Sequence, residues 1–259
     1  MRIQGRDCTL TVARDGELTP LPYSEETVRL TSKGYVIPEC IGQRNREKTV
    51  ITKKEIEGCF ITRLDYSVIQ CLFLLFFFDE QTFDLYADRG FEKIIYKNVN
   101  LSGFELRGEN KEALKLRVDV KSSDNSFTDN WALNVPDLSW LPQKTFFFDG
   151  HNVIADLITL PLVYRFELTA KYSGTTKLSL KLYFPLSTEH YPLSSKIEKL
   201  TIWIDMKEGI WLDLYDLVPL TDLCDINCAD TVLCYQIFNV TGIMVLNIRN
   251  AEQNLQIVI

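Results

Sequence analysis

Apolar and polar residues alternate through most of this chain, and this period of two constrains its fold more than any other feature. In the stretch ALKLRVDVK, large apolar residues from Leu114 to Val120 fall at every second position, with charged residues between them. Successive side chains of a strand point to opposite faces, so this pattern predicts a strand with one buried face. VYRFELTA, KLSLKLYF and KLTIWIDM alternate in the same way. We therefore predict a mainly β protein of antiparallel sheets, folded as sandwich or barrel modules.

One stretch departs from this alternation. The run VIQCLFLLFFFDE, Val68 to Glu80, is apolar apart from one glutamine until its last two residues. A membrane helix needs about 18 apolar residues, so the run is too short to predict one. A strand buried on both faces and a short helix both fit, but the composition and the capping residues Asp65 or Ser67 favour a helix over 66–77. Such a helix has no polar face, so its outer side needs a cover from the same chain or from a second subunit.

The segment SKGYVIPECIGQRNREKTVITKKE, Ser32 to Glu55, is polar, mixed in charge and interrupted by Gly34, Pro38 and Gly42. This composition predicts a long loop or an extended hairpin arm. A loop of that length within a compact domain is commonly functional or bound to a partner, and a solvated loop without a function is the alternative.

The net charge and the number of cysteines limit the classes of protein to which this chain can belong. The chain has 259 residues and a formal net charge of −7. A protein that grips nucleic acid neutralises phosphates with basic residues, so this charge counts against that class but suits a wall along which nucleic acid slides. The seven cysteines are an odd number, and the first residues contain no apolar signal segment. We therefore expect reduced thiols in a cytoplasmic setting.

Motifs of the common catalytic and cofactor sites do not occur in the sequence. It contains two histidines, His151 and His190, and no glycine-rich phosphate loop, H-E-x-x-H or G-x-S-x-G. Two clusters suggest a metal or a catalytic carboxylate, but buried thiols and charged turns explain them more simply. We predict no enzyme activity, no cofactor and no metal site, and we expect His151 in a turn. The clusters are Cys224, Cys228 and Cys234, and Asp213, Asp216, Asp222, Asp225 and Asp230.

Two segments of the chain resemble each other. FELRGENKEALKLRVDVK, from Phe104, and FELTAKYSGTTKLSLKLYF, from Phe166, each contain a strand, a polar turn and a strictly alternating second strand. This internal similarity predicts two related β modules, although any two amphipathic hairpins look somewhat alike. We expect a first module with the helix at 1–125, a connection rich in Asp, Asn, Ser and Pro at 126–150, and a second module at 151–259.

The order of these pieces resembles the tail tube proteins of tailed bacteriophages. A polar segment comes first, followed by the strand-forming NREKTVITKKEIEGCFITRL, the short helix and the hairpin FEKIIYKNVNLSGFELRGENKEALKLRVDVK. In that family a β-sandwich or barrel flanked by a helix builds stacked rings, and the segment before the helix reaches toward the neighbouring ring. Some members carry two tandem modules, so that three chains form a pseudohexameric ring. The pattern covers 32–125; after Phe184 no comparable helix follows, and LTDLCDINCADTVLCY is the nearest substitute.

This resemblance implies a structural virion protein of tail-tube type that assembles into stacked trimeric or hexameric rings around a conduit for DNA. The implied partners are copies of the same chain, other tail proteins and DNA that passes without specific binding, with no membrane contact. The implied location is the virion tail, assembled in the host cytoplasm. The expected interface residues are Phe73 and Phe77 of the helix and, on the arm, Tyr35, Arg44, Arg46, Lys48 and Lys53.

Three other functions stay open from the sequence. The chain fits another β component of a tail, baseplate or injection system, or a carboxylate enzyme that uses Asp213 to Asp230. It also fits a β-sandwich that binds carbohydrate or protein by stacking on Trp131, Trp140, Trp203 and Trp211. Trp203 and Trp211 alternate with Leu and Ile, however, and we expect them to pack between sheets or modules.

Overall fold

The computed structural model consists mostly of antiparallel β structure, which confirms the predicted fold class. The structure is 77% strand, and helix is almost absent from its described residues. The sheet does not close into a barrel. The structure describes residues 9–14, 17–21, 23–41, 44–65, 68–69, 72, 82–90, 92–122, 127–129, 145–173, 175–185, 196–206, 209–223, 233–250 and 253–258.

The strands group into two compact units, each made of separate segments of the chain. The strands β5 (Arg44–Arg63), β7 (Lys93–Glu109) and β8 (Lys115–Ser122) each contribute to both. The predicted consecutive modules at 1–125 and 151–259 stay a prediction, and much of the connection at 126–150 lies outside the described residues. Unit 1 comprises Met1–Ile61, Glu80–Ser102 and Val118–Ser139, and unit 2 comprises Thr62–Asp79, Gly103–Arg117 and Trp140–Ile259.

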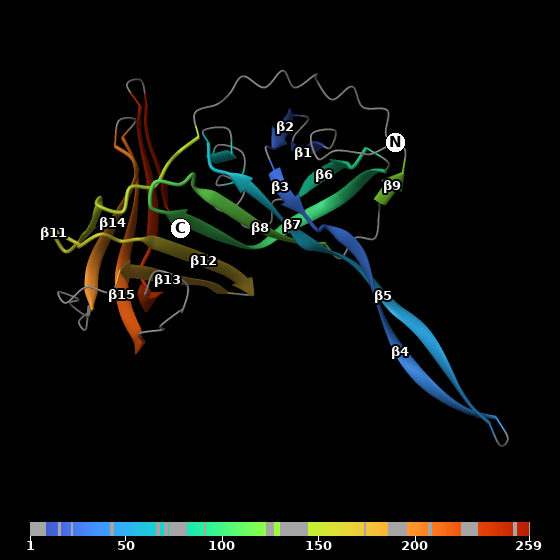
Figure 1. The fold of residues 1–259 in the computed structure, drawn as a ribbon. Coiled ribbons are helices and arrows are strands. Elements are labelled where there is room, and N and C mark those ends of the chain that lie inside the picture. Colours follow the sequence, from blue (N-terminus) through green and yellow to red (C-terminus); the bar gives the residue numbers. More distant parts are fainter. Residues whose placement is uncertain are drawn as a thin grey trace. The chain divides into compact units, whose positions relative to one another are not determined.

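One sheet of unit 1 is built around β1 (Thr9–Arg14) (Figure 1). Leu10 and Val12 of β1 stand opposite Ala87 and Leu85 of β6, and all four side chains are buried. Burial alternates along β6, as the period of two requires. The strand order is β2 (Glu17–Leu21), β1, β6 (Phe83–Asp88), the first part of β7, and β9 (Phe127–Asp129).

A second group of strands in unit 1 surrounds β5, which pairs with β3 (Tyr23–Glu26), β4 (Arg29–Ile41) and β8. Ile56 and Phe60 of β5 are fully buried. The predicted half-buried strand at 113–121 is confirmed along β8. Its four apolar residues are buried, and Lys115, Arg117 and Lys121 are exposed.

The polar segment after Arg29 is a hairpin of β4 and β5, the second of the two forms expected from the sequence. Cα partners run from Arg29↔Glu57 to Ile41↔Arg44, with one register shift between Lys33 and Gly34. At about 3.4 Å per residue, the length from Lys33 to Ile41 is roughly 27 Å. Figure 1 shows this hairpin extending away from the other strands of unit 1. Residues 33–53 are called the arm below.

The residues that follow β5 begin a helical turn capped by Asp65. Its Oδ1 accepts a hydrogen bond from Val68 N over 2.9 Å, and its carbonyl oxygen accepts one from Ile69 N over 3.0 Å. This is N-cap geometry, at one of the two residues that the sequence indicates for the cap. The rest of the predicted helix, apart from a buried Leu72, lies outside the described residues, and so do Phe73 and Phe77.

The first sheet of unit 2 brings together the two segments of similar sequence, which begin at Phe104 and Phe166. β7 pairs with β12 from Gly103↔Lys171 to Glu109↔Arg165. In the core beneath them, Phe166 meets Phe148 edge to face, with ring centroids 4.8 Å apart. The strand order is the second part of β7, β12 (Arg165–Ser173), β13 (Thr175–Pro185), β16 (Leu233–Val240) and the end of β15 (Ile210–Leu223).

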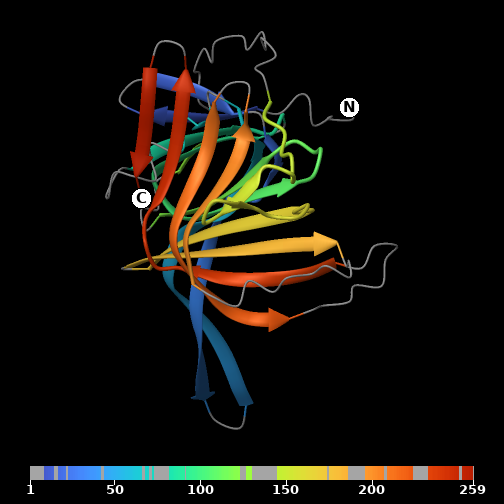
Figure 2. The ribbon, with the colours of Figure 1, turned by 90° about the vertical axis from the view of Figure 1, so that its left-hand side faces the viewer.

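The second sheet of unit 2 shares β15 with the first. Residues of β15 up to Leu214 pair with β17, and those from Leu217 pair with β16; between them Asp216 has a φ of 54°. The β16–β17 turn follows the same corner, because Thr241 N donates to Asp216 O over 3.0 Å. Figure 2 shows that the strands of the two sheets run in different directions. The strand order is β11 (Ile158–Thr159), β10 (Val153–Ala155), β14 (Ile197–Asp205), the start of β15, β17 (Met244–Asn250) and β18 (Gln253–Val258).

The alternation predicted for β13 and β14 is confirmed with one exception. The apolar residues at alternate positions from Leu178 to Phe184 are buried, and so are those from Leu200 to Ile204. Met206, expected on the same side, is 58% exposed, because β14 ends one residue earlier.

Candidate functional site

The arm brings the five residues predicted from the sequence to one face of a hairpin. Directly opposed residues of an antiparallel pair share a face, and the face alternates along each strand. Thr52 is the extra residue at the register shift, which keeps Lys53 on the same face as the others. Tyr35, Arg44, Arg46, Lys48 and Lys53 therefore belong to one face. Its opposed pairs are Lys33↔Lys53, Tyr35↔Val50, Ile37↔Lys48, Glu39↔Arg46 and Ile41↔Arg44.

The two faces of the arm differ in charge. On the face just described, five lysines and arginines stand against the single acid Glu39, a formal charge of +4. The opposite face has Glu47 as its charged residue. The whole chain carries −7, so the arm concentrates positive charge on an acidic protein. This basic face of the arm is complementary to an acidic partner surface.

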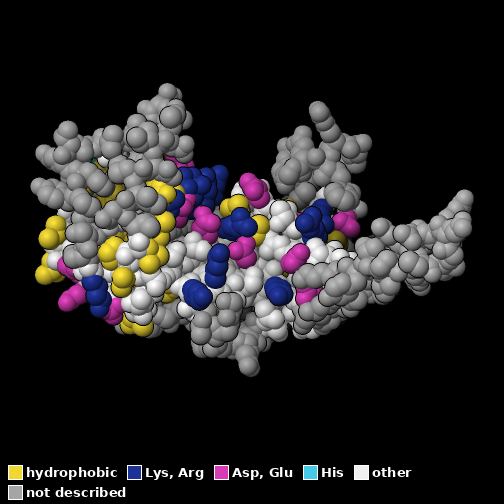
Figure 3. Space-filling view, turned by 90° about the horizontal axis from the view of Figure 1, so that it is seen from below, with side chains coloured by type: hydrophobic (Ala, Val, Ile, Leu, Met, Phe, Trp, Pro, Cys, Tyr) yellow, Lys and Arg dark blue, Asp and Glu magenta, His cyan; other side chains and the backbone are white. Residues whose placement is uncertain are grey.

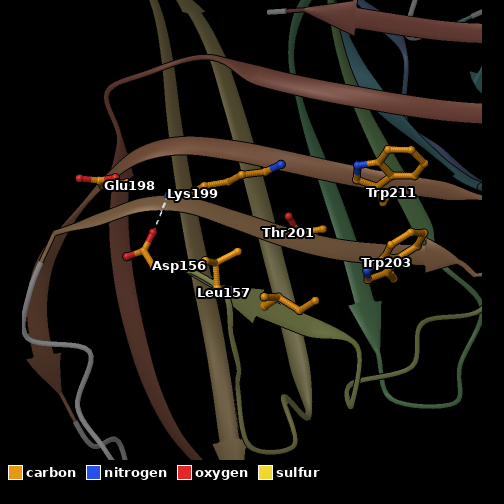
Figure 4. A pocket seen from close by; sticks show the side chains of 8 residues that line it. Asp156, Leu157, Glu198, Lys199, Thr201, Trp203 and Trp211 are labelled. Carbon is orange, nitrogen blue, oxygen red and sulfur yellow. Dashed lines mark hydrogen bonds between the residues drawn. The ribbon is translucent and has the colours of Figure 1, made fainter.

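A second candidate site is an open groove of about 510 Å³ in unit 2, along β14 (Figure 4). Residues of β10, the β10–β11 turn, β14 and β15 line it. Trp203 and Trp211 stand at one end, and Thr201 lies in the middle. The other end carries Asp156, Leu157, Glu198 and Lys199. The groove therefore has an aromatic end and a charged end.

A buried carboxylate organises the groove. Asp213 on β15 is 4% exposed, and its Oδ1 accepts a hydrogen bond from Thr201 Oγ1 over 2.6 Å. Its Oδ2 accepts from Trp211 Nε1 over 3.1 Å and from Asn247 Nδ2 over 3.0 Å, and lies 3.1 Å from Lys199 Nζ. A buried charge is tolerated when it is paired and hydrogen-bonded in this way. Asp213 thereby holds Trp211 and Lys199 in place.

Lys199 is kept cationic by this carboxylate. Burial acts to lower the pKa of Lys199, but the hydrogen bond to Asp213 and the charge of Asp213, with a contribution from Tyr215, raise the pKa above its ordinary value. The ammonium and the carboxylate neutralise each other. The remaining charge of the groove comes from Asp156 and Glu198, which are both exposed and both negative.

The β10–β11 turn holds a leucine in a strained and exposed position. Asp156 and Leu157 form the two-residue connection, with φ values of 45° and 74°. Hairpin turns with two positive φ values normally use Asn, Asp or Gly, and leucine is disfavoured there. Leu157 is 98% exposed and Ile158 is 69% exposed. Burial of these side chains within the chain therefore does not offset the free-energy cost of the strained turn. The sequence does not indicate this turn, because Leu157 continues the apolar pattern of a strand.

Exposed large apolar side chains gather on unit 2. Figure 3 shows yellow side chains on the surface of its strands, next to charged ones. The exposed large apolar residues in the described part of the chain all belong to unit 2: Phe147, Leu157, Ile158, Met206, Val218, Leu220 and Ile243.

The tryptophans on β14 and β15 line the groove instead of packing between sheets. Trp203 and Trp211 oppose each other directly, with ring centroids 5.0 Å apart and a tilt of 38°. Both are half-buried, whereas Ile202 and Leu212 on the other side of the sheet are fully buried. The remaining candidates, Trp131 and Trp140, lie outside the described residues.

Of the predicted aspartate series, the structure describes the side chains of Asp213 and Asp216. Asp216 forms an exposed ion pair with Lys196 at the corner of β15. Asp225, Asp230, Cys224 and Cys228 lie outside the described residues, and Asp222 and Cys234 lie on strands without described side chains. The structure thus separates a buried, hydrogen-bonded Asp213 from a partly exposed Asp216.

His151 is exposed in a turn, as expected, and its backbone N donates to Asp149 Oδ1 over 3.1 Å. Within the described part of the chain, no three His, Cys, Asp or Glu side chains are grouped to hold a metal ion. In the same residues no helix has the length and apolarity to cross a membrane.

No protein-family model matches the chain, and a comparison with curated proteins finds no match either.

Proposed function

We propose that this chain is a structural protein of tail-tube type, whose copies assemble into stacked rings around a conduit for DNA. The observation that carries the proposal is the arm. It is the outer part of a long two-stranded hairpin in a mainly β protein, and the second strand of that hairpin, β5, leads to the capped turn at Asp65. Arm, helix start and following hairpin stand in the order in which the sequence resembles tail tube proteins.

An open sheet edge supports the same proposal. In the described part of the chain, β18 pairs on one side only, with β17, from Val245↔Val258 to Asn250↔Gln253. An unpaired strand edge presents backbone N–H and C=O groups that can pair with a strand of another subunit. In the proposed assembly, sheets of neighbouring copies join edge to edge, and rotational symmetry closes the ring.

In this assembly, the basic face of the arm and the acidic remainder of the chain have different roles. The basic face of the arm contacts acidic neighbouring copies, while the net charge of −7 keeps DNA phosphates from adhering to the wall of the conduit. The partners are copies of this chain, other tail proteins and DNA in passage, and the location is the virion tail after assembly in the host cytoplasm. The role is structural, with no catalytic step and no cofactor.

The direct test is electron microscopy and sedimentation velocity of the purified full chain over a series of concentrations. We expect rings or tubes, and a sedimentation coefficient that rises with concentration. A monomer at every concentration and salt condition would contradict the proposal.

A second test concerns the predicted helix. If a second subunit covers its outer face, Phe73→Asp and Phe77→Asp should block ring formation while leaving the circular dichroism spectrum and the urea midpoint of the monomer unchanged. Loss of the folded monomer in both variants would instead show that the same chain covers this face.

A further inference from the structure

We infer that the groove of unit 2 receives the basic face of the arm of a second copy of this chain. The inference rests on the proposed self-assembly and identifies the acceptor surface for the arm. Four observations support it: charge, dimensions, aromatic chemistry and the strained Leu157.

The charges of the two surfaces are complementary. The basic face carries +4. At the groove, the two nearby lysines are already engaged, Lys199 by Asp213 and Lys196 by Asp216. Asp156 and Glu198 therefore leave the charged end of the groove negative. Opposed charges of this kind steer association and fix the register of the partner.

The dimensions of the two surfaces agree. The groove follows β14 from Glu198 to Trp203, about 17 Å at 3.4 Å per residue. Residues Arg44, Arg46 and Lys48 are at successive positions of one face, and span about 14 Å by the same rise. Three cationic residues on one strand of the arm therefore span most of the length of the groove.

The aromatic end suits the same occupant. Guanidinium groups stack on indole rings, and the alkyl stem of a basic side chain packs on the same surface. Trp211 is held for such a contact by its hydrogen bond to Asp213, and Trp203 packs against it. An arginine-rich strand therefore finds both a stacking surface and carboxylates in one groove.

Leu157 indicates that the occupant is a protein surface. Its positive φ is a strained conformation for leucine, and within the chain it is almost fully exposed. Strained residues persist where a functional contact requires them. The basic face also carries Ile37 and Ile41, which offer Leu157 an apolar partner. A saccharide would use the tryptophans, but it would leave the exposed leucine unexplained.

The inference is tested by charge exchange in the full chain. Variant A carries Arg44→Glu and Arg46→Glu in the arm. Variant G carries Asp156→Asn and Glu198→Arg in the groove, where Asn tolerates the positive φ of residue 156. Each variant alone should raise the protein concentration for half-maximal assembly by at least about tenfold, since like charges then face each other. An equimolar mixture of A and G should restore assembly, because the new carboxylates of A then meet the cationic groove of G, and the unchanged arm of G meets the unchanged groove of A.

Two control variants change the charge at positions outside the proposed contact. Glu112→Lys alters an exposed glutamate of unit 2 whose ion pair with Lys115 is long, at 3.9 Å, and it should leave assembly unchanged. Asn45→Asp alters the other face of the arm and should also leave assembly unchanged.

A second readout does not require rings. In sedimentation velocity, a mixture of A and G should form heterodimers, whereas each variant alone should sediment as a monomer. Normal assembly of G, or failure of the mixture to form heterodimers, overturns the inference and assigns the tryptophans to another ligand such as a saccharide. Heterodimers without rings from any variant, the parent chain included, would uphold the groove and count against the proposed tube.

Discussion

Arg89 and Glu26 form a doubly hydrogen-bonded ion pair in unit 1, with Arg89 Nε donating to Glu26 Oε2 and Nη2 donating to Oε1, both over 2.9 Å. Nη2 also donates to Val28 O, which accepts a further bond from Tyr96 Oη over 2.8 Å. The guanidinium thus connects the end of β3 with the turn after β6. The hydrogen bond to Glu26 raises the pKa of Arg89, although burial opposes this, so the arginine stays charged.

Removing one partner of this ion pair should destabilise the protein strongly. We expect Glu26→Gln to lower the free energy of unfolding by about 2–4 kcal/mol, because Arg89 then keeps a partly buried charge without its carboxylate. Glu92→Gln removes a second, more exposed carboxylate from the same arginine and should cost under about 1 kcal/mol. Urea titrations followed by tryptophan fluorescence measure both. Equal losses for the two variants would contradict this assignment.

The two aspartates of β15 with described side chains, Asp213 and Asp216, should lose different amounts of stability on the same substitution. Asp213→Asn removes the charge that binds Lys199 and puts an amide among hydrogen-bond donors, so we expect a loss of about 2–4 kcal/mol. Asp216→Asn keeps a residue that tolerates positive φ and loses an exposed ion pair, at a cost below about 1 kcal/mol. Thermal unfolding of the two variants compares them directly. A more stable Asp213→Asn variant would show that the carboxylate is not bound as described.

Much of the fold follows from the sequence because local rules decide it. The period of two identifies β8, β13 and β14 and their buried sides, and Asp65 stands as a helix cap before an apolar run. The long polar segment is compatible with a hairpin, but composition alone does not distinguish a hairpin from a loop. Strand pairing decides that question, and it depends on contacts across the turn.

The sites were harder to predict because they depend on which distant residues become neighbours. Asp213 sits on the polar side of an alternating strand, where an exposed side chain is the simplest expectation. It is buried because β14 and β17 bring Lys199 and Asn247 over it. Likewise, the basic face of the arm depends on the register and on the extra residue Thr52, which the alternation does not reveal.

Relief of the strained turn should separate folding from assembly. Leu157→Gly should stabilise the monomer by about 0.5–1 kcal/mol, because glycine tolerates positive φ and the gain exceeds its greater entropy when unfolded. The same variant should weaken assembly, because the exposed apolar side chain is lost from the groove. Unfolding curves and sedimentation measure the two effects separately. A variant that is more stable and assembles normally would remove Leu157 from the interface.

Salt should weaken assembly through the basic face of the arm. The Debye length falls from about 10 Å at 0.1 M salt to about 3 Å at 1 M, so attraction between the arm and an acidic neighbour is screened. We expect the concentration for half-maximal assembly to rise with NaCl, and Arg46→Gln to reduce that dependence. Asn45→Asp changes the charge by the same amount at the adjacent position on the opposite face, and it should keep the salt dependence of the parent chain. Turbidity and sedimentation over a NaCl series measure it. If salt promotes assembly equally in all three proteins, apolar contacts such as those proposed for Phe73 and Phe77 carry the interface instead of the arm.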